Sequence, residues 1–284
     1  MSPQNENLLI RVATAVVLIP LVLALIWAGG WPLTLLVAAA AGGCAYEMGA
    51  ITLRSSPVST RVLAVIAAAG IPLLFAPFSP LLTAEELLGC LVGLVILFWV
   101  VNLFCLGEDL SSVPGRVGLS MFAVLYCGAM LAPLLLLREE PAGFWWLILV
   151  LAVTFLSDTG AYAAGRAIGR RKLAPRVSPS KTWEGFAGGM VAGSGGAVAV
   201  VAVSSVLTLD GVSPLPICLP GAAVGGLVVA AFGAAGDLCE SVLKRAFDVK
   251  DSGRVIPGHG GVLDRVDALL FTIPVVWLWS LVSG

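Results

Sequence analysis

The sequence predicts an all-α polytopic integral membrane protein with about nine transmembrane helices and a cytoplasmic amino terminus. Three observations predict this fold class: the composition, the recurrence of long apolar runs and the uneven distribution of basic residues. Of the 284 residues, 59% are hydrophobic and only 12% are charged, and the mean hydropathy is +1.02. Soluble domains average roughly 25% charged residues, so most of this surface is expected to face lipid rather than water.

Apolar windows long enough to cross a bilayer, which takes roughly 20 residues, recur along the chain and are separated by Gly, Pro and charge clusters. The windows lie at residues 8–28, 32–53, 60–79, 86–106, 116–137, 143–165, 183–207, 216–238 and 266–283. We expect an amino-terminal region, 1–140, with about five spans. A carboxy-terminal catalytic region, 141–284, would hold about four spans and two polar cytoplasmic loops, 166–182 and 239–265.

The basic residues test the number of spans, because cytoplasmic loops of membrane proteins carry an excess of Lys and Arg. With nine spans, 15 of the 16 basic residues fall on one side and only Arg138 lies opposite. Merging or splitting one span would scramble this segregation. The pattern therefore predicts a cytoplasmic amino terminus and a carboxyl terminus across the membrane.

Polar residues interrupt the apolar pattern in three places: Glu47, the stretch from Ser157 and Asp158 to Tyr162, and the end of the eighth window. Ionisable groups at membrane depth are costly and usually face a cavity or a partner. At the third place the spacing is i, i+3, i+4, i+7, which puts four side chains on one helical face. These are Asp237, Glu240, Ser241 and Lys244. Such a stripe suits metal and phosphate binding, and the alternative is a set of helix-end residues that reach back to water.

The loop after this stripe contains glycines around His259, the only histidine, followed by Asp264 and Asp267 one helical turn apart. Carboxylate oxygens suit Mg²⁺, which bridges to substrate phosphates. Asp237 and Asp264 would hold the metal from two helices. The basic residues Lys244, Arg245 and Arg265 would neutralise phosphate oxygens. An ordinary charged cytoplasmic loop would explain the basic residues alone, and His259 suits a turn as well as proton transfer.

A second phosphate-compatible element precedes the seventh window, where Ser178-Pro-Ser180-Lys181-Thr182-Trp-Glu184-Gly leads into an apolar run. A Ser or Thr before a helix caps it, and the exposed amides attract anions. Lys181 beside such a terminus would strengthen phosphate binding. The alternative is an ordinary capped helix with a lysine that only sets the membrane topology. The element lacks the pattern of a Walker A loop.

The residues from Ser241 to Asp267 resemble the signature of the phosphatidate cytidylyltransferases, also called CDP-diacylglycerol synthases. The run reads Ser241-Val-Leu-Lys244-Arg245, then Lys250-Asp251, then Pro257-Gly-His259-Gly-Gly261-Val-Leu-Asp264-Arg265-Val-Asp267. The elements around Asp158 and Lys181 also resemble this family, so the similarity covers about 140–284. The resemblance implies transfer of CMP from CTP to phosphatidic acid, giving CDP-diacylglycerol and pyrophosphate. It also implies dependence on Mg²⁺, a contribution from a monovalent cation such as K⁺, and a homodimer.

On this resemblance we assign roles to the candidate residues. Asp237 and Asp264 are expected to bind metal and, with Lys244 and Arg265, to be catalytic. The substrate-binding set is Ser178, Ser180, Lys181, Thr182, Ser241, Arg245, Lys250, His259, Gly260 and Gly261. Three more acids, Asp158, Glu184 and Asp267, would orient a base or join the metal site.

Two other classes compete with this interpretation. A CTP-using polyprenol kinase or another lipid-phosphate transferase would also place acids and bases at a cytoplasmic membrane edge. A transporter or channel would instead carry charges near the middle of the bilayer or in paired interrupted helices. We expect the partners to be CTP, phosphatidic acid and the lipid bilayer, with no nucleic acid. The protein is expected in the inner or plasma membrane with its site on the cytoplasmic side.

Overall fold

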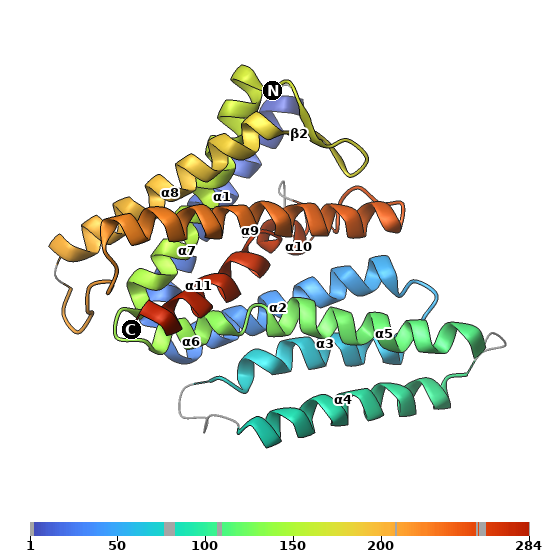
Figure 1. Cartoon of the computed structure of the whole chain (residues 1–284). Helices are drawn as coiled ribbons and strands as arrows, with labels where there is room; N and C mark the ends of the chain where they lie inside the picture. Colours follow the sequence, from blue (N-terminus) through green and yellow to red (C-terminus); the bar gives the residue numbers. More distant parts are fainter. Residues whose placement is uncertain are drawn as a thin grey trace. The chain divides into compact units, whose positions relative to one another are not determined.

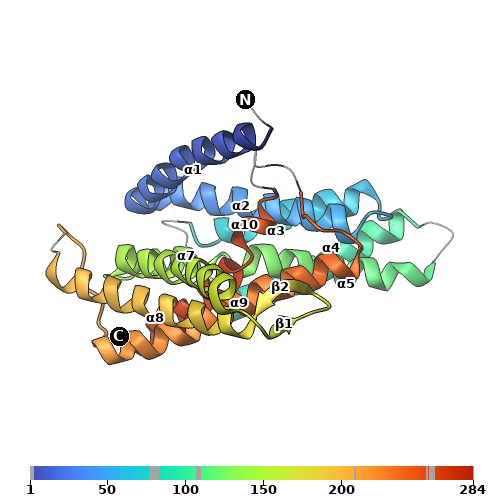
Figure 2. The same ribbon diagram turned by 90° about the horizontal axis from the view of Figure 1, so that it is seen from above.

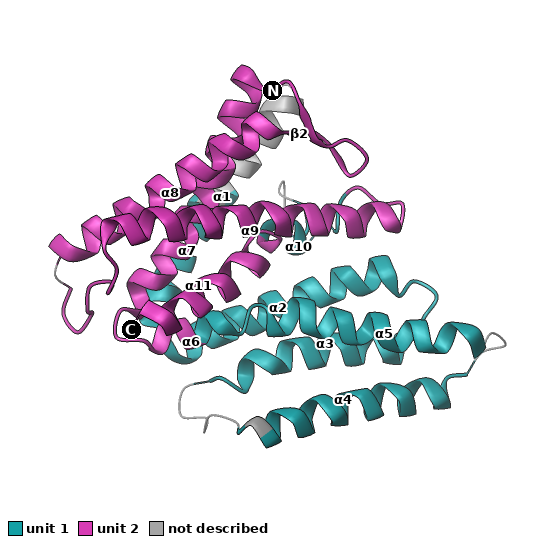
Figure 3. Ribbon diagram, in the orientation of Figure 1, with its two compact units in different colours: residues 1–135, 251–265 teal, residues 136–250, 266–284 magenta. Residues whose placement is uncertain are grey.

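The computed structural model describes residues 3–76, 83–106, 110–207, 209–253, 255 and 260–283. The chain forms two compact units (Figure 3). Unit 1 comprises residues 1–135 and 251–265, and unit 2 comprises residues 136–250 and 266–284. The segment 251–265 belongs to unit 1 although its neighbours on both sides in the sequence belong to unit 2, so α9 and α11 are in one unit and the loop between them is in the other.

The described residues of unit 1 are built from helices (Figure 1), and the segment η2 among them is π-helical. Its elements are α1 (Pro3–Ala28), α2 (Gly30–Thr52), α3 (Val58–Leu73), α4 (Ala84–Phe104), η1 (Leu110–Ser112), α5 (Val113–Ala123) and η2 (Val124–Ala129). Helix α2 packs mainly on α3, and α3 also contacts η2. Helices α6 (Pro133–Glu139) and α10 (Leu263–Val266) lie where the chain passes between units.

The packed centre of unit 1 joins α3, α4, α5 and η2 through apolar side chains. Phe98 is fully buried there among Ala64, Val117 and Val124. Small residues on α3 leave room for the aromatic ring, so the helices approach closely. This dense contact fixes the relative positions of the four elements.

Unit 2 is built from four long helices and one short hairpin. They are α7 (Gly143–Ile168), β1 (Lys172–Ala174), β2 (Ser178–Thr182), α8 (Trp183–Val206), α9 (Leu219–Ala246) and α11 (Leu269–Ser283). Helix α8 lies beside both α7 and α9 (Figure 2). A Cβ on Gly160 of α7 would come within 2.8 Å of the Gly188 carbonyl of α8. Small residues thus bring these backbones together, as is common between membrane helices.

Strands β1 and β2 add a short hairpin, which was not expected from the sequence, to the mostly helical fold. Strands β1 and β2 pair antiparallel, with Lys172 opposite Thr182 and Ala174 opposite Ser178. The amides of Arg170 and Arg171 donate to the Glu184 carboxylate, which closes the base of the hairpin. The strands have only three and five residues, too few for the alternating pattern by which a strand is recognised in sequence.

Seven helices among the described residues are long and apolar enough to cross a membrane. They lie at Gly30–Thr52, Glu85–Phe104, Leu110–Glu139, Gly143–Ile168, Trp183–Val206, Leu219–Ala246 and Leu263–Ser283. Two shorter apolar helices, Val16–Ala28 and Val58–Leu73, overlap the first and third predicted windows. Large apolar side chains such as Val191 and Leu278 are exposed, which is typical of a surface that contacts lipid. The helices are therefore consistent with a polytopic membrane protein.

Candidate active site

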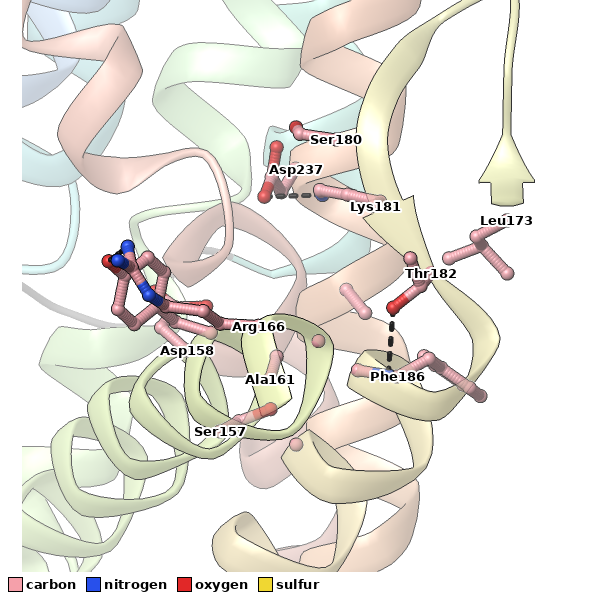
Figure 4. Close-up of a pocket in the computed structure, with 15 residues that line it drawn as sticks. Ser157, Asp158, Ala161, Arg166, Leu173, Ser180, Lys181, Thr182, Phe186 and Asp237 are labelled. Carbon is pink, nitrogen blue, oxygen red and sulfur yellow. Dashed lines mark hydrogen bonds and ion pairs between the residues drawn. The ribbon is translucent and has the colours of Figure 1, made fainter. Parts of the chain in front are cut away.

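A cavity of about 430 Å³ lies within unit 2, lined by α7, β1, β2, α8 and α9 (Figure 4). Its polar wall includes Ser157 and Asp158 of α7, Ser180 and Lys181 of β2, and Asp237 of α9. Small-molecule sites in proteins commonly have volumes of roughly 300–1,000 Å³. The cavity is thus large enough for a small polar ligand or for one part of a nucleotide.

An ion pair between Lys181 and Asp237 crosses the cavity from β2 to α9 (Figure 4). The two side chains are 25% and 33% exposed, so the pair is partly shielded from water and still open to a ligand. A phosphate entering the cavity would compete with Asp237 for Lys181. Displacement of the ion pair would then release one cation toward the phosphate and one carboxylate toward a metal ion.

A second charged set lies on α7, where Asp158, Tyr162 and Arg166 are spaced i, i+4, i+8 on one helical face and all line the cavity. The Arg166 guanidinium donates a hydrogen bond from Nη1 to the Tyr162 hydroxyl at 3.1 Å. Arg166 was not among the residues expected at the site from the sequence. Its helical spacing from Asp158 was the signal that would have identified it.

The start of α8 is capped as the sequence predicted. Thr182 is the N-cap residue, and its Oγ1 accepts a hydrogen bond from the Gly185 amide at 3.1 Å. Glu184, which was expected to orient a base or join a metal site, accepts hydrogen bonds from the amides of Arg170 and Arg171. Glu184 thus holds the hairpin against α8.

The predicted stripe on α9 forms two pairs. Ser241 Oγ donates to Asp237 Oδ1 at 3.5 Å, and Lys244 pairs with Glu240 at 2.5 Å. Glu240 is only 1% exposed, so the Lys244–Glu240 pair is far more buried than the Lys181–Asp237 pair. Lys244, expected to be a catalytic phosphate-binding residue, is therefore also the counter-ion of a buried acid.

Arg245 reaches the hairpin rather than the cavity wall. Its Nε donates to the Val177 carbonyl at 3.4 Å and its Nη1 donates to the Val249 carbonyl at 3.2 Å. The bond to Val177 ties the end of α9 to the turn between β1 and β2, and the bond to Val249 stays within the segment that follows α9. Arg245 thus supports the element that carries Lys181.

Asp264 lies in unit 1 at the start of α10, where its Oδ2 accepts hydrogen bonds from the Ser252 amide at 3.1 Å and the Gly261 amide at 3.0 Å. Gly260 has φ +84°, a left-handed conformation that favours glycine. Gly260 and Gly261, two of the loop glycines expected from the sequence, therefore form a turn beside Asp264. His259 lies outside the described residues.

The remaining candidates lie at the edges of these groups. Ser178 pairs with Ala174 in the hairpin. Lys250 is exposed in unit 2, and Arg265 is exposed in α10. Asp267 belongs to unit 2, and its Oδ1 accepts a hydrogen bond from the Ala268 amide at 2.8 Å.

The structure thus brings five of the sequence candidates together around the cavity of unit 2, and another group around Asp264 in unit 1. The five are Asp158, Ser180, Lys181, Thr182 and Asp237. Asp237 and Asp264, the expected metal ligands, belong to different units. In the part of the chain that the structure describes, no three His, Cys, Asp or Glu side chains form a metal-binding cluster. The metal pair therefore stays a prediction.

The apolar helices, together with a cavity that pairs acids and bases, define a polytopic helical membrane protein with a polar, phosphate-compatible site. The sequence model of the Cytidylyltransferase family matches residues 9–282, and this chain belongs to that family. It is 36% identical over 279 residues to the phosphatidate cytidylyltransferase of Brucella suis, covering 97% of this chain and 94% of that protein. It is 40% identical over 163 residues to the phosphatidate cytidylyltransferase of Bacillus subtilis, covering 57% of each chain.

Proposed function

We propose that this chain is a CTP:phosphatidate cytidylyltransferase. It transfers CMP from CTP to phosphatidic acid and yields CDP-diacylglycerol and pyrophosphate. The observation that carries the proposal is the polar cavity of unit 2, with its Lys181–Asp237 pair, in a chain 36% identical over nearly its whole length to a phosphatidate cytidylyltransferase. A membrane-embedded helical fold suits a reaction between a water-soluble nucleotide and a lipid.

The chemistry requires positioning and charge neutralisation rather than a strong base. An oxygen of the phosphatidate attacks the α-phosphorus of CTP and forms a new P–O bond. The bond from that phosphorus to the oxygen shared with the β-phosphorus breaks, and pyrophosphate leaves with the electron pair. Because the attacking phosphate is already anionic near pH 7, the protein contributes mainly electrostatic stabilisation of the transferring group.

The side chains of the cavity have distinct roles in this proposal. Lys181 neutralises phosphate charge once its pair with Asp237 opens, and Arg166 of α7 provides a second cation in the cavity lining. Ser180 donates hydrogen bonds to phosphate oxygens. Lys244 and Arg265 complete the basic set, as the family resemblance implies.

Magnesium would be held by Asp237 and Asp264, and when bound it neutralises charge on the leaving pyrophosphate. The donor chemistry fits, because Mg²⁺ is commonly bound by one or two carboxylates and completes its shell with water and substrate phosphates. Asp237 is partly exposed on the cavity wall, which leaves room for such a shell. A monovalent cation such as K⁺ and a homodimer are part of the same proposal.

We also propose nine spans, a cytoplasmic amino terminus and a site on the cytoplasmic face of the plasma membrane. The support is the segregation of 15 of the 16 basic residues to one side. CTP is cytoplasmic, and phosphatidic acid would enter from the lipid. A cavity reached from that face would meet both substrates.

The test uses the full chain in detergent with phosphatidic acid, Mg²⁺ and CTP labelled in the cytidine. Label in the lipid fraction with release of pyrophosphate is the expected result. Asp237→Asn should abolish both. Asp210→Asn, which removes an exposed acid from the loop between α8 and α9 in the same unit, should leave the rate unchanged.

Other outcomes would contradict the proposal. Appearance of labelled CDP in water with none in lipid would identify a kinase that transfers only the γ-phosphate. Absence of CTP consumption with several lipids, with K⁺ present, would favour transport.

A further inference from the structure

Glu47 lies on α2 among apolar neighbours and is only 1% exposed. An acid buried in this way is strongly destabilising unless several donors compensate it. The proposed mechanism uses residues from the carboxy-terminal half of the chain and gives Glu47 no role. Its surroundings therefore require an explanation.

The carboxylate of Glu47 faces the loop 251–263, more than 200 residues further along the chain, in the same unit. The Val262 amide donates to Oε1 and the Leu263 amide donates to Oε2, each at 2.9 Å. The Ser252 hydroxyl donates to Oε2 at 2.9 Å. One side chain of α2 thus binds both ends of the described part of this loop.

Ser252 connects Glu47 to Asp264. Its Oγ lies 2.9 Å from Glu47 Oε2 and 2.9 Å from Asp264 Oδ2, so the single hydroxyl hydrogen is shared between two carboxylates. The Ser252 amide also donates to Asp264 Oδ2 at 3.1 Å. A change at Glu47 would therefore reach Asp264 through one intervening residue.

Two glycines show how closely the loop encloses this acid. A Cβ on Gly253 would lie 2.7 Å from Cδ of Glu47, and a Cβ on Gly261 would lie at the same distance. The Cβ on Gly261 would also collide with the Ser252 hydroxyl. Only glycine fits at both positions while Glu47 keeps its place.

We propose that Glu47 is a positioning residue that holds Asp264 in its functional orientation through Ser252 and the 260–263 turn. The inference rests on the proposed function only in giving Asp264 a role in the reaction. Fully bonded buried polar networks impose one arrangement on the groups they join. A group that binds metal or substrate must be held to within a fraction of an ångström. The hydrogen bonds that Glu47 of α2 accepts from the loop would fix Asp264 in this way.

Glu47→Gln keeps the shape of the side chain and replaces one acceptor oxygen with an NH₂ group, which cannot accept from the same donors. Thr52→Val is the matched control, because Thr52 is buried on the same helix and, among the described residues, its hydroxyl bonds only to the Met48 carbonyl. Both variants would be compared with the wild type by turnover and by amide hydrogen exchange. The exchange measurement covers residues 251–253 and 260–264, with Trp183–Val206 of unit 2 as the internal reference.

Glu47→Gln is expected to lower kcat about 10- to 100-fold, as outer-shell substitutions commonly do. The concentration of Mg²⁺ for half-maximal activity should rise, whereas KM for CTP should change little. Exchange should accelerate at the Ser252 and Gly261 amides, which bond to Asp264 rather than to Glu47, and should stay unchanged in Trp183–Val206. Thr52→Val should match the wild type in all these measurements.

Unchanged exchange at Ser252 and Gly261, or a kcat equal to that of Thr52→Val, would overturn the proposal. Faster exchange throughout the chain would also overturn it, because the role of Glu47 would then be global stability. If Glu47→Gln does not fold, Ser252→Ala decides, since it removes the bridge and leaves α2 intact. For Ser252→Ala, faster exchange confined to the loop together with a lower kcat would support the proposal. Exchange and kcat equal to those of the wild type would refute it.

The proposed function and this inference can fail separately. A wild-type chain that forms no CDP-diacylglycerol would refute the activity. The exchange at Ser252 and Gly261 would still show whether Glu47 positions Asp264.

Discussion

The basic side chains of unit 2 differ in what their loss would leave behind. Lys244 pairs with Glu240, which is 1% exposed, whereas Lys181 pairs with Asp237, which is 33% exposed. A buried acid without its cation is strongly destabilising, but a partly exposed acid can be hydrated. Loss of Lys244 should therefore reduce stability as well as any phosphate binding, whereas loss of Lys181 should impair ligand binding with little effect on stability.

For Lys244, we predict that Lys244→Met lowers stability by about 3–5 kcal/mol because it removes the cation that pairs with the buried Glu240. The double variant Lys244→Met/Glu240→Gln should recover most of that loss. Thermal unfolding in detergent measures both. The single variant Glu240→Gln completes the comparison. If the double variant lost as much stability as the two single variants added together, the pair would not be coupled.

For Lys181, we predict that Lys181→Met lowers kcat/KM for CTP about 100-fold, comparable to the loss of one donor from an oxyanion site. The melting temperature should change little. Lys172→Met is the matched control, because Lys172 is an exposed base on the neighbouring strand of the same hairpin. Equal losses in both variants would mean that general positive charge, rather than the position of Lys181, attracts the nucleotide.

At the scale of elements, the contact between α7 and α8 depends on small residues on both helices. A Cβ on Gly188 would lie 3.0 Å from the Gly160 carbonyl and would collide with the Ala164 methyl. Gly195 lies on the same helix, and a Cβ there would have nothing within 4 Å. One helix therefore supplies both a test position and its control.

We predict that Gly188→Ala destabilises the protein by about 1–3 kcal/mol, as overpacking usually does. The added methyl group should also displace α8 and so lower activity, because residues at the start of α8 line the cavity. Gly195→Ala should be neutral or slightly stabilising, since alanine favours a helix more than glycine does. Melting temperatures and turnover of the two variants check this. Equal effects would indicate that helix propensity, rather than close packing, determines the outcome.

The helices and the cap of α8 could be predicted from the sequence because both depend on neighbouring residues. Apolar windows predicted the seven helices long enough to cross a membrane, and Thr182 before an apolar run predicted the N-cap, which its hydrogen bond from the Gly185 amide confirms. The hairpin was missed because its closure depends on Glu184 binding amides 13 and 14 residues earlier. The contact of Glu47 with Leu263 joins residues 216 apart, and no local pattern indicates it. The lone acid in an apolar helix predicted only that a partner exists.

At the scale of the whole molecule, the number of spans determines which loops face the cytoplasm. The described residues contain seven helices long enough to cross, and α3 is shorter, with 16 residues. A helix of 16 residues is about 24 Å long, less than the ~30 Å of a typical hydrocarbon core. Bilayer thinning or flanking residues can accommodate such a length. If α3 did not cross, every loop after it would change sides relative to the amino terminus.

We predict that α1 and α3 both cross, so that the hairpin between α7 and α8 is cytoplasmic and the loop between α8 and α9 is external. In a chain with its six cysteines replaced, Arg176→Cys would mark the hairpin turn and Asp210→Cys would mark the external loop. Both positions are exposed. In intact cells a membrane-impermeant maleimide should label the cysteine at 210 and not the one at 176, and permeabilised cells should label both.

Reporter fusions at the two ends show whether the number of spans is odd or even. With nine spans, green fluorescent protein on the amino terminus should fluoresce, and alkaline phosphatase on the carboxyl terminus should be active. Both ends on the same side would require an even number of spans and would place either the first or the third helix on the membrane surface. Reversal of the maleimide pattern would move Lys181 to the external face. CTP does not occur there at useful concentration, so that single result would contradict both the topology and the proposed substrate.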